Sequence, residues 1–213
     1  MTAHGPPQAG ERPLVAVLDY GIGNLRSAQK ALERVGADAR LTADPTLAAE
    51  AAGMVLPGVG AFGRCMTALR QENLDQVALG AIDAGVPFLA ICVGMQLLYD
   101  GSEESPGVEG LGVLPGTVRR LPDGVKRPQM QWNVVDVVGD PALTAGLVKP
   151  VWAYFVHSFA PEPGEHVVAT CDYGGPVVAA IERGPLWATQ FHPEKSGTTG
   201  LAILANFVAS LRA

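Results

Sequence analysis

The chain has few charged side chains and no excess of basic ones. Only 17% of its 213 residues are charged, and the formal net charge is −6. Proteins that bind nucleic acids present clusters of lysine and arginine to the phosphate backbone. This charge balance therefore argues against a nucleic-acid partner.

Long apolar runs are also missing. No stretch reaches the roughly 18 to 20 consecutive apolar residues that a membrane-spanning helix needs. Residues 1–12 are polar and contain proline and glycine, without the apolar segment of a secretory signal peptide. We therefore expect no membrane association, a cytoplasmic location and a disordered tail over residues 1–12. With 48% hydrophobic residues in the chain, residues 13–213 can bury one substantial core as a single domain.

Cysteine and histidine are scarce, with three cysteines and four histidines. An odd number of cysteines in a chain without an export signal suits reduced thiols. These residues do not follow the Cys-x-x-Cys or His-x₃-His spacing of a zinc site. We therefore expect no metal and no cofactor.

One cysteine stands where a strand-like run turns into a helical pattern. Cys92 follows the apolar residues 86–91 and is flanked by the small residues Ala90 and Gly94. A nucleophile at the apex of such a turn is held in a strained conformation, which requires small neighbours. The N-terminus of the following helix favours a thiolate and can donate an amide to an oxyanion. We interpret Cys92 as a nucleophile, although an intracellular cysteine is usually just a small buried residue.

A matching base follows a second apolar run. His192, Pro193 and Glu194 come directly after residues 186–191. In an extended segment, side chains two residues apart share a face, so the carboxylate of Glu194 is expected to orient the imidazole of His192. A thiol, a base and an orienting carboxylate are the three parts of a hydrolytic triad. Alone, His-Pro-Glu would be read as a polar turn, but together with Cys92 it favours catalysis.

A third apolar run ends in a glycine-rich segment at residues 57–60. Glycines allow the backbone to approach a ligand closely and to turn its amides toward it. We interpret Gly58, Val59 and Gly60 as one side of an oxyanion hole, with the amide of Val93 as the other. The alternative is an ordinary strand-to-helix loop.

Taken together, these motifs resemble the class I, triad-type glutamine amidotransferase family. Four longer stretches, at 18–25, 57–63, 154–158 and 190–197, are similar to one branch of this family, the glutaminase subunits of imidazole glycerol phosphate synthase. The similarity runs from about residue 14 to the C-terminus. Several motifs in the same order make this resemblance more specific than any one of them.

The resemblance implies an enzyme that hydrolyses glutamine to glutamate and ammonia. Its partner would be a separate cyclase subunit, a (β/α)₈ barrel, in a heterodimer that makes imidazole glycerol phosphate and aminoimidazole carboxamide ribotide in histidine biosynthesis. By motif, Cys92 is the nucleophile, His192 the base and acid, and Glu194 its orienter. Matched positions for binding glutamine are Gln96, Ser158 and Phe159, and matched positions for coupling to the partner are Asn24, Trp132, Tyr154 and Lys195.

Some positions depart from the family pattern. Ala90 replaces the glycine that usually begins the turn, which tightens the turn at little expected cost. Gln129 and Gln131 replace a histidine and a glycine in a segment that lies toward the partner in the family, so they bear on docking or allosteric signalling and leave the triad untouched. Phe159 stands where tyrosine is common and lacks only the hydroxyl.

Three other interpretations remain open. The chain would be a glutaminase subunit of another amidotransferase, although the motifs at 19–24 and 192–197 speak against this. A cysteine peptidase on a related α/β fold would cleave protein without a partner. A silent regulatory subunit would keep the turn without the chemistry, and a glutamine-analogue electrophile would then leave Cys92 unlabelled.

The remaining polar residues have structural interpretations. Asn24 is expected to cap a helix, since asparagine is a good N-cap residue. His157 is expected to be a hydrogen-bonded histidine at a strand end, and Cys65 and Cys171 to be structural. Trp132 is interpreted as a partner contact and not as part of the core.

Alternating strand and helix patterns in the first half predict parallel strands with crossover helices. We predict an α/β, flavodoxin-like fold, with a mainly parallel central sheet flanked by helices and additional antiparallel strands from the second half. Strands are expected at 14–19, 37–42, 53–56, 87–91, 116–121, 132–138, 152–160, 167–173, 177–182 and 186–190. Helices are expected at 25–35, 65–85, 92–99 and 200–211.

Overall fold

The structure is a computed structural model that describes residues 12–212. The prediction of a disordered tail at residues 1–12 therefore falls almost wholly outside the described residues. Among residues 12–212, no helix is both long and apolar enough to cross a membrane.

Five parallel strands form one half of a nine-stranded sheet. Their order across the sheet, β2-β1-β3-β4-β12, is that of flavodoxin-like folds. Strands β3 and β4 are buried at every position, as expected for parallel strands covered on both faces. The strands are β1 (Leu14–Leu18), β2 (Asp38–Thr42), β3 (Gly53–Gly58), β4 (Phe88–Cys92) and β12 (Leu186–Thr189).

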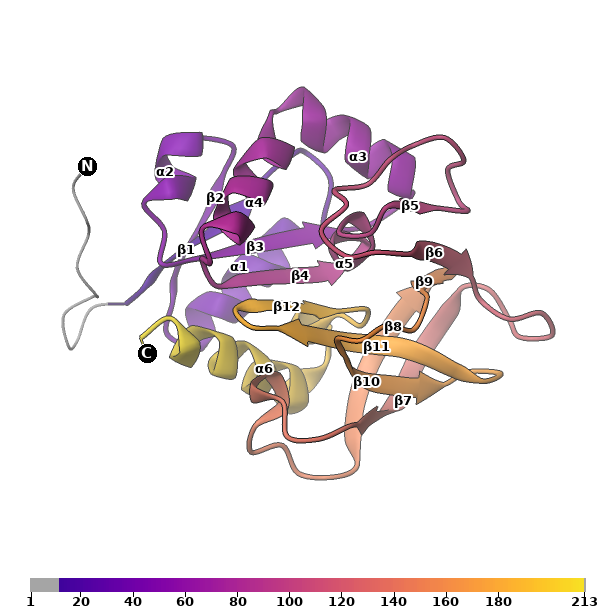
Figure 1. Ribbon diagram of the computed structural model, residues 1–213. Helices are drawn as coiled ribbons and strands as arrows, with labels where there is room; N and C mark the ends of the chain where they lie inside the picture. Colours follow the sequence, from indigo (N-terminus) through magenta and orange to yellow (C-terminus); the bar gives the residue numbers. More distant parts are fainter. Residues whose placement is uncertain (1–11, 213) are drawn as a thin grey trace.

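Helices cover both faces of this parallel half. In Figure 1, α2, α3 and α4 lie above the strands and α6 lies below them, where α1 packs against α6. The short helix α5 follows β4 at the edge where the parallel strands end. The helices are α1 (Leu25–Arg34), α2 (Pro45–Ala49), α3 (Phe62–Gln71), α4 (Leu74–Asp83), α5 (Val93–Leu97) and α6 (Gly197–Ser210).

The second half of the chain adds antiparallel strands. β11, β10, β7 and β8 continue the large sheet beyond β12, and β5, β6 and β9 form a small second sheet. Two short 3₁₀ helices are η1 (Ala142–Thr144) and η2 (Pro193–Lys195). The strands are β5 (Gly101–Ser102), β6 (Thr117–Arg120), β7 (Gln129–Val137), β8 (Val151–His157), β9 (Phe159–Pro161), β10 (Val167–Asp172) and β11 (Pro176–Arg183). The predicted fold class is confirmed.

Several element boundaries were wrong. The predicted helix at 65–85 is two helices, because Asn73 adopts a left-handed conformation with φ 55° between them. The predicted strand at 152–160 breaks at Ser158, where the chain passes from the large sheet into the small one. Helix α2 was missed, although Asp44 caps it by accepting a hydrogen bond from the Thr46 amide at 2.8 Å.

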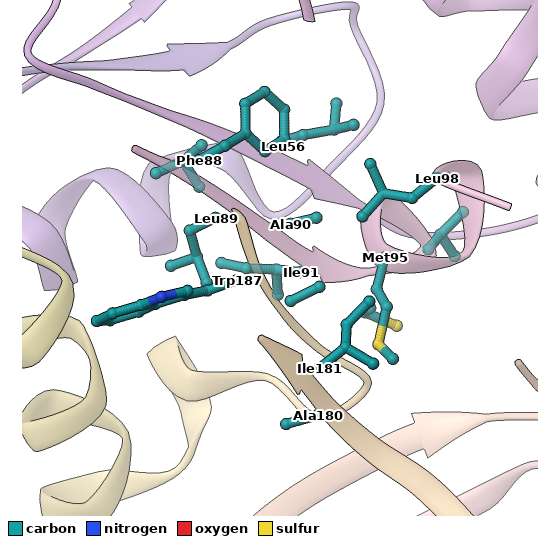
Figure 2. Close-up of a cluster of buried hydrophobic side chains, with 14 of the residues drawn as sticks. Leu56, Phe88, Leu89, Ala90, Ile91, Met95, Leu98, Ala180, Ile181 and Trp187 are labelled. Carbon is teal, nitrogen blue, oxygen red and sulfur yellow. The ribbon is translucent and has the colours of Figure 1, made fainter. Parts of the chain in front are cut away.

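The core around β4 fixes the end of this strand. Figure 2 shows Leu56, Phe88 and Ile91 among the side chains packed here, with Trp187 on the neighbouring strand β12. Ala90, the departure from the family pattern, is fully buried in the middle of β4. A methyl group is thus accommodated at this position within the strand.

The turn after β4 depends on a glycine. A Cβ at Gly94 would lie 2.0 Å from the carbonyl oxygen of Leu56, a backbone atom that has no room to move. We expect Gly94→Ala to lower the free energy of unfolding by at least about 1–3 kcal/mol through overpacking. Urea denaturation measures this change.

The matched control is Gly80→Ala in helix α4. A Cβ at Gly80 meets no atom within 4 Å, and its backbone is not in the left-handed region. Its stability should stay unchanged or rise by about 0.5–1 kcal/mol. Equal stability of Gly94→Ala and wild type would show that the turn tolerates a side chain.

Candidate active site

Cys92 occupies a strained position at the end of the central strand β4. Its φ of 56° and ψ of −112° lie in a region that non-glycine residues rarely adopt. Such strain costs about 1–3 kcal/mol and is concentrated at functional sites. The residue is 2% exposed and lines a cavity of about 230 Å³. The strained turn expected from the sequence is therefore present.

The cavity gathers most of the predicted site residues from distant parts of the chain. Those that line it are Cys92, His192, Val59, Gly60, Val93, Gln96, Ser158 and Phe159. Residues that sequence reasoning did not assign to the site also line it, namely Glu104, Pro128, Val156 and His157. The chemistry of the cavity therefore includes groups that no motif indicated.

His192 and Glu194 form a buried pair beside this cavity. The Nδ1 atom of His192 and Oε1 of Glu194 are 2.8 Å apart, and their side chains are 1% and 2% exposed. The predicted contact exists, but the reasoning from an extended segment was wrong. Strand β12 already ends at Thr189, and Glu194 lies in the 3₁₀ helix η2, so a tight turn brings the two side chains together.

The charge state of His192 is set by two neighbours. Burial lowers the pKa of His192, but the neighbouring sulfur of Cys92 and the hydrogen-bonded carboxylate of Glu194 together outweigh burial and raise the pKa to about 10. The ring is therefore an imidazolium at neutral pH. Its Nε2 atom has no hydrogen-bond partner among the described residues. The Cys92 sulfur is one of the two groups that raise the pKa of the ring.

Gln96 is held by two hydrogen bonds that use its amide nitrogen. Nε2 donates to the carbonyl of Phe159 at 2.9 Å and to Oε1 of Gln190 at 3.0 Å. The Nε2 atom of Gln190 in turn lies 3.7 Å from the sulfur of Cys92. Gln96 therefore offers its carbonyl oxygen, and not its amino group, to a ligand in the cavity.

The glycine-rich segment borders Cys92 because β3 and β4 are paired in parallel. Gly58 is the register partner of Cys92, and it has no room for a side chain between the Gly94 amide and the Tyr20 hydroxyl. Val59 and Gly60 line the cavity. Neither of their amides donates to a backbone carbonyl within residues 12–212.

His157 is only half satisfied, which corrects the sequence prediction. Its Nδ1 lies 2.9 Å from the carbonyl of Phe159, but its buried Nε2 has no partner among the described residues. Burial, together with the charge of His192, outweighs the hydrogen bond to Phe159 and lowers the pKa of His157 to about 4. The ring is neutral, with a proton on Nδ1, so Nε2 is a hydrogen-bond acceptor.

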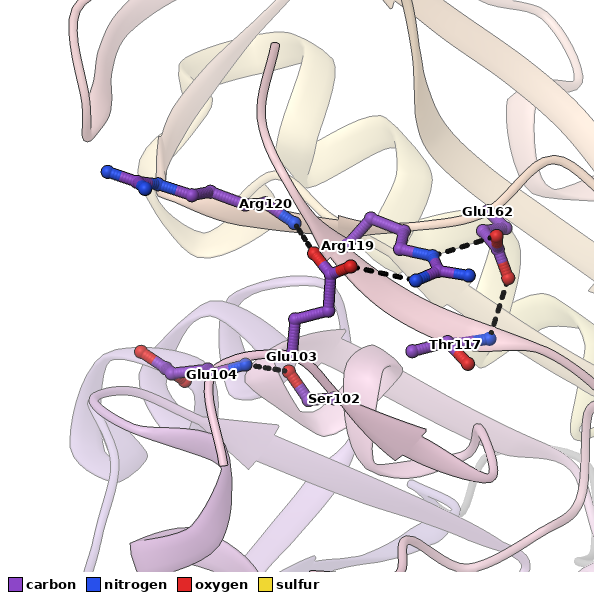
Figure 3. Close-up of polar contacts among 7 residues, drawn as sticks. All are labelled: Ser102, Glu103, Glu104, Thr117, Arg119, Arg120 and Glu162. Atoms are coloured by element: carbon purple, nitrogen blue, oxygen red, sulfur yellow. Dashed lines mark hydrogen bonds and ion pairs between the residues drawn. The ribbon is translucent and has the colours of Figure 1, made fainter. Parts of the chain in front are cut away.

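Glu104 brings a carboxylate to the cavity from an irregular loop. Its Oε2 accepts a hydrogen bond from the Phe62 amide at 2.7 Å. Figure 3 shows the neighbouring ion pairs, in which Arg119 contacts Glu103 at 2.7 Å and Glu162 at 2.9 Å. Exposed pairs of this kind contribute little stability, but they connect the loop to strands β6 and β9. Sequence reasoning missed Glu104 because its loop carries no periodic pattern.

The residues assigned to partner coupling lie outside the cavity. Trp132 is 47% exposed, and its ring packs edge-on against Tyr154 with centroids 6.1 Å apart. The Tyr154 carbonyl accepts a hydrogen bond from the His192 amide at 3.0 Å, and Lys195 is exposed in η2. Asn24 begins α1, but its side chain makes no capping hydrogen bond, so that prediction was wrong.

The two glutamines that depart from the family pattern have different surroundings. Gln131 is exposed on β7. Gln129 is completely buried, with Nε2 3.8 Å from the sulfur of Cys171 and Oε1 without a partner among the described residues. Because its side chain is buried, Gln129 itself presents no surface to a partner, whereas Gln131 does. Within residues 12–212, no cluster of three or more acidic, histidine or cysteine side chains is arranged to hold a metal ion.

Comparison with protein families agrees with this geometry. The family model described as glutamine amidotransferase class-I matches residues 16–211. The chain belongs to this family of class I glutamine amidotransferases. Two solved structures share the fold at low sequence identity. One is a glutamine amidotransferase, with a TM-score of 0.72 and 21% identity, and the match covers 93% of this chain and 98% of that chain. The other is PurLQS from Thermotoga maritima, with a TM-score of 0.71 and 19% identity, and the match covers 94% of this chain and 97% of that chain.

Curated relatives narrow the class. The imidazole glycerol phosphate synthase subunit HisH of Methanothermobacter thermautotrophicus is 50% identical over 201 residues, which cover 94% of this chain and all of that protein. HisH of Thermobifida fusca is 49% identical over 211 residues, with the same coverage. Within the class I amidotransferases, the chain belongs to the HisH family. The resemblance inferred from the sequence is confirmed.

The imidazolium of His192 has a testable titration. We expect Glu194→Gln to lower the pKa of His192 from about 10 by about 1–3 units, because a buried negative charge beside the ring is removed. NMR of histidine-labelled protein follows this titration.

Since the folded pKa of His192 lies above the ordinary value of 6.5, the stability that the charged ring contributes is complete below about pH 6.5 and is lost as the pH rises through about 10.

Glu103→Gln serves as the control, since its carboxylate is exposed and pairs with Arg119. This substitution should leave the pKa of His192 unchanged. A titration midpoint that is the same in Glu194→Gln and in wild type would contradict the role of the carboxylate.

Proposed function

We propose that this chain is the glutaminase subunit of imidazole glycerol phosphate synthase, with Cys92, His192 and Glu194 as its catalytic triad. It hydrolyses glutamine to glutamate and ammonia and delivers the ammonia to a separate cyclase subunit for histidine biosynthesis. The observation that carries the proposal is that a strained Cys92 and His192 line one cavity, while the buried carboxylate of Glu194 lies 2.8 Å from the His192 ring. The identity to HisH proteins supports the choice of synthase.

The chemistry follows from these three side chains. The thiolate of Cys92 attacks the side-chain carboxamide carbon of glutamine, and the carbonyl π electrons move onto oxygen. The amides of Val93, Val59 and Gly60 stabilise this oxyanion. When the tetrahedral intermediate collapses, its C–N bond breaks, and the imidazolium of His192 protonates the nitrogen, which leaves as ammonia. Neutral His192 then takes a proton from water, which attacks the thioester and releases glutamate and the thiolate.

The cavity suits a single amino acid. Its volume of about 230 Å³ is below the 300–1,000 Å³ that is typical of pockets for larger ligands. Glu104 offers a carboxylate for the α-ammonium group, and the carbonyl oxygen of Gln96 offers an acceptor. The corner at Ser158 and Phe159 would bind the polar end of glutamine through its backbone.

Two other functions fit less well. A peptidase would need an extended groove for a polypeptide, whereas Cys92 opens onto a compact cavity. A silent regulatory subunit would have no need to place the pair of His192 and Glu194 beside a cysteine held in a strained backbone conformation. A synthase other than imidazole glycerol phosphate synthase is disfavoured by the identity of about half the residues to HisH.

The partner would dock on an apolar face of the β7–β8 pair. Met130, Trp132 and Trp152 are 60%, 47% and 46% exposed. The register pairs Trp132 with Tyr154 and Val134 with Trp152, so these side chains share one face of the sheet. Exposed aromatic residues of this kind are typical anchors of protein interfaces. We assign this face, together with Asn24 and Lys195, to a (β/α)₈ cyclase subunit in a heterodimer.

The setting of the enzyme follows from the same observations. Cys65, Cys92 and Cys171 are free and buried, which suits a reducing compartment such as the cytoplasm. The buried residues of the described chain form one continuous hydrophobic cluster, which supports a single amidotransferase domain over residues 13–213.

Removal of the nucleophile tests the triad. We expect Cys92→Ala to abolish glutamine-dependent cyclisation by the complex and to leave synthesis from added ammonium salts intact, because free ammonia bypasses Cys92. The assay compares both nitrogen sources with the same cyclase subunit. A variant that is equally inactive with both sources would contradict the assignment.

Coupling to the partner is the second test. We expect the chain alone to hydrolyse glutamine slowly, and faster once the cyclase subunit binds its nucleotide ligand, since linked sites influence one another reciprocally. Trp132→Ala should weaken the heterodimer by about 2 kcal/mol or more, as for a buried interface anchor. Calorimetric titration measures the affinity. The control is Val148→Ala, an 86% exposed side chain that lies in the loop before β8 and outside both strands.

Full glutaminase activity of the isolated chain would contradict the coupling. Unchanged affinity of Trp132→Ala would show that the partner docks elsewhere.

A further inference from the structure

Two buried side chains outside the triad hold the glycine-rich segment 57–60. The Tyr20 hydroxyl donates to the Pro57 carbonyl at 2.6 Å, and the Cys65 thiol donates to the Val59 carbonyl at 3.3 Å. Tyr20 follows β1 and is 3% exposed, whereas Cys65 lies in α3 and is fully buried. Two separate elements thus contact alternate carbonyls of the same short segment.

These contacts determine where the backbone amides can point. In a trans peptide, the carbonyl and the N–H of the same unit point in opposite directions. Because the Val59 carbonyl is turned toward Cys65, the Gly60 amide is turned away from α3. Val59 and Gly60 border the cavity, and their amides donate to no described backbone carbonyl. Gly60 has a φ of +92°, a conformation that glycine adopts readily.

We propose that Tyr20 and Cys65 are positioning residues that hold the 57–60 segment with the Pro57 and Val59 carbonyls inward and the Gly60 amide available to the oxyanion formed at Cys92. The inference rests on the proposed glutaminase function. Neither residue touches the substrate, and each acts through the backbone that it holds. Cys65 is therefore more than the structural cysteine that the sequence suggested.

Both side chains are in the donor form that this role requires. Burial, as the largest cause, raises the pKa of the Cys65 thiol to about 11, so the thiol keeps its proton at neutral pH. Burial also raises the pKa of Tyr20 above its ordinary value. The Tyr20 hydroxyl lies so close to the segment that a Cβ at Gly58 would be 2.9 Å from it.

Substitutions that remove only the donors test the proposal. In the complex with the cyclase subunit, we expect Cys65→Ala and Tyr20→Phe each to lower kcat for glutamine about tenfold. The double variant should lower kcat about a hundredfold, which is the usual effect of losing one oxyanion donor. KM should change less than twofold. Cys65→Ser keeps a donor and should recover most of the lost kcat.

A second measurement separates positioning from general damage. Alkylation of Cys92 by iodoacetamide displaces iodide at a saturated carbon, so it forms no oxyanion and needs no donor from the segment. We expect its rate, followed by mass spectrometry at Cys92, to be the same in wild type, Cys65→Ala and Tyr20→Phe. Cys171→Ala, which removes a buried thiol far from the segment in the fold, should leave both kcat and alkylation unchanged.

The outcomes are distinct. Lower kcat with unchanged alkylation, and recovery in Cys65→Ser, support the proposal. Unchanged kcat in both single variants, or alkylation that falls in parallel with kcat, overturns it. An inactive wild-type complex with a fully labelled Cys92 would instead overturn the proposed glutaminase function.

Discussion

The parallel pairing of β4 with β3 on one side and β12 on the other is the constraint on which the site depends. Parallel strands end at the same edge of a sheet, so the segments that follow them are neighbours whatever their separation in sequence. Gly58 is in register with Cys92, and Thr189 is in register with Ile91. Cys92, the glycine-rich segment and the turn that carries His192 therefore lie together because three buried strands are aligned.

Several features of the site oppose folding. Cys92 adopts a strained backbone, Gly94 touches the Leu56 carbonyl, and the polar pair of His192 and Glu194 is removed from water. Each feature opposes folding when considered alone. The surrounding fully buried strands offset these costs, since β3 and β4 have no exposed position. The buried strands β3 and β4 thus stabilise the strained segment that follows them at the edge of the sheet.

Sequence patterns predicted the parts of the site that follow local rules. Cys92, Gly60 and His192 each end an apolar run, and apolar runs followed by glycine or proline are visible without a structure. Glu104 was missed because it reaches the cavity from an irregular loop. The orphaned Nε2 of His157 and the burial of Gln129 depend on the pairing of β7 with β8, which a single sequence does not reveal.

Tyr154 on the edge strand β8 connects the apolar face to the proposed triad through two contacts. Tyr154 packs against Trp132 on the exposed side, and its carbonyl accepts the His192 amide on the other. Ser196 adds a second bridge, because its hydroxyl contacts both the Tyr154 amide and the His192 carbonyl. A subunit bound at Trp132 would therefore contact the strand whose backbone holds His192. Linked sites usually show coupling free energies of about 1–3 kcal/mol. The contacts through Tyr154 and Ser196 are a direct route for coupling of this size between the apolar face and His192.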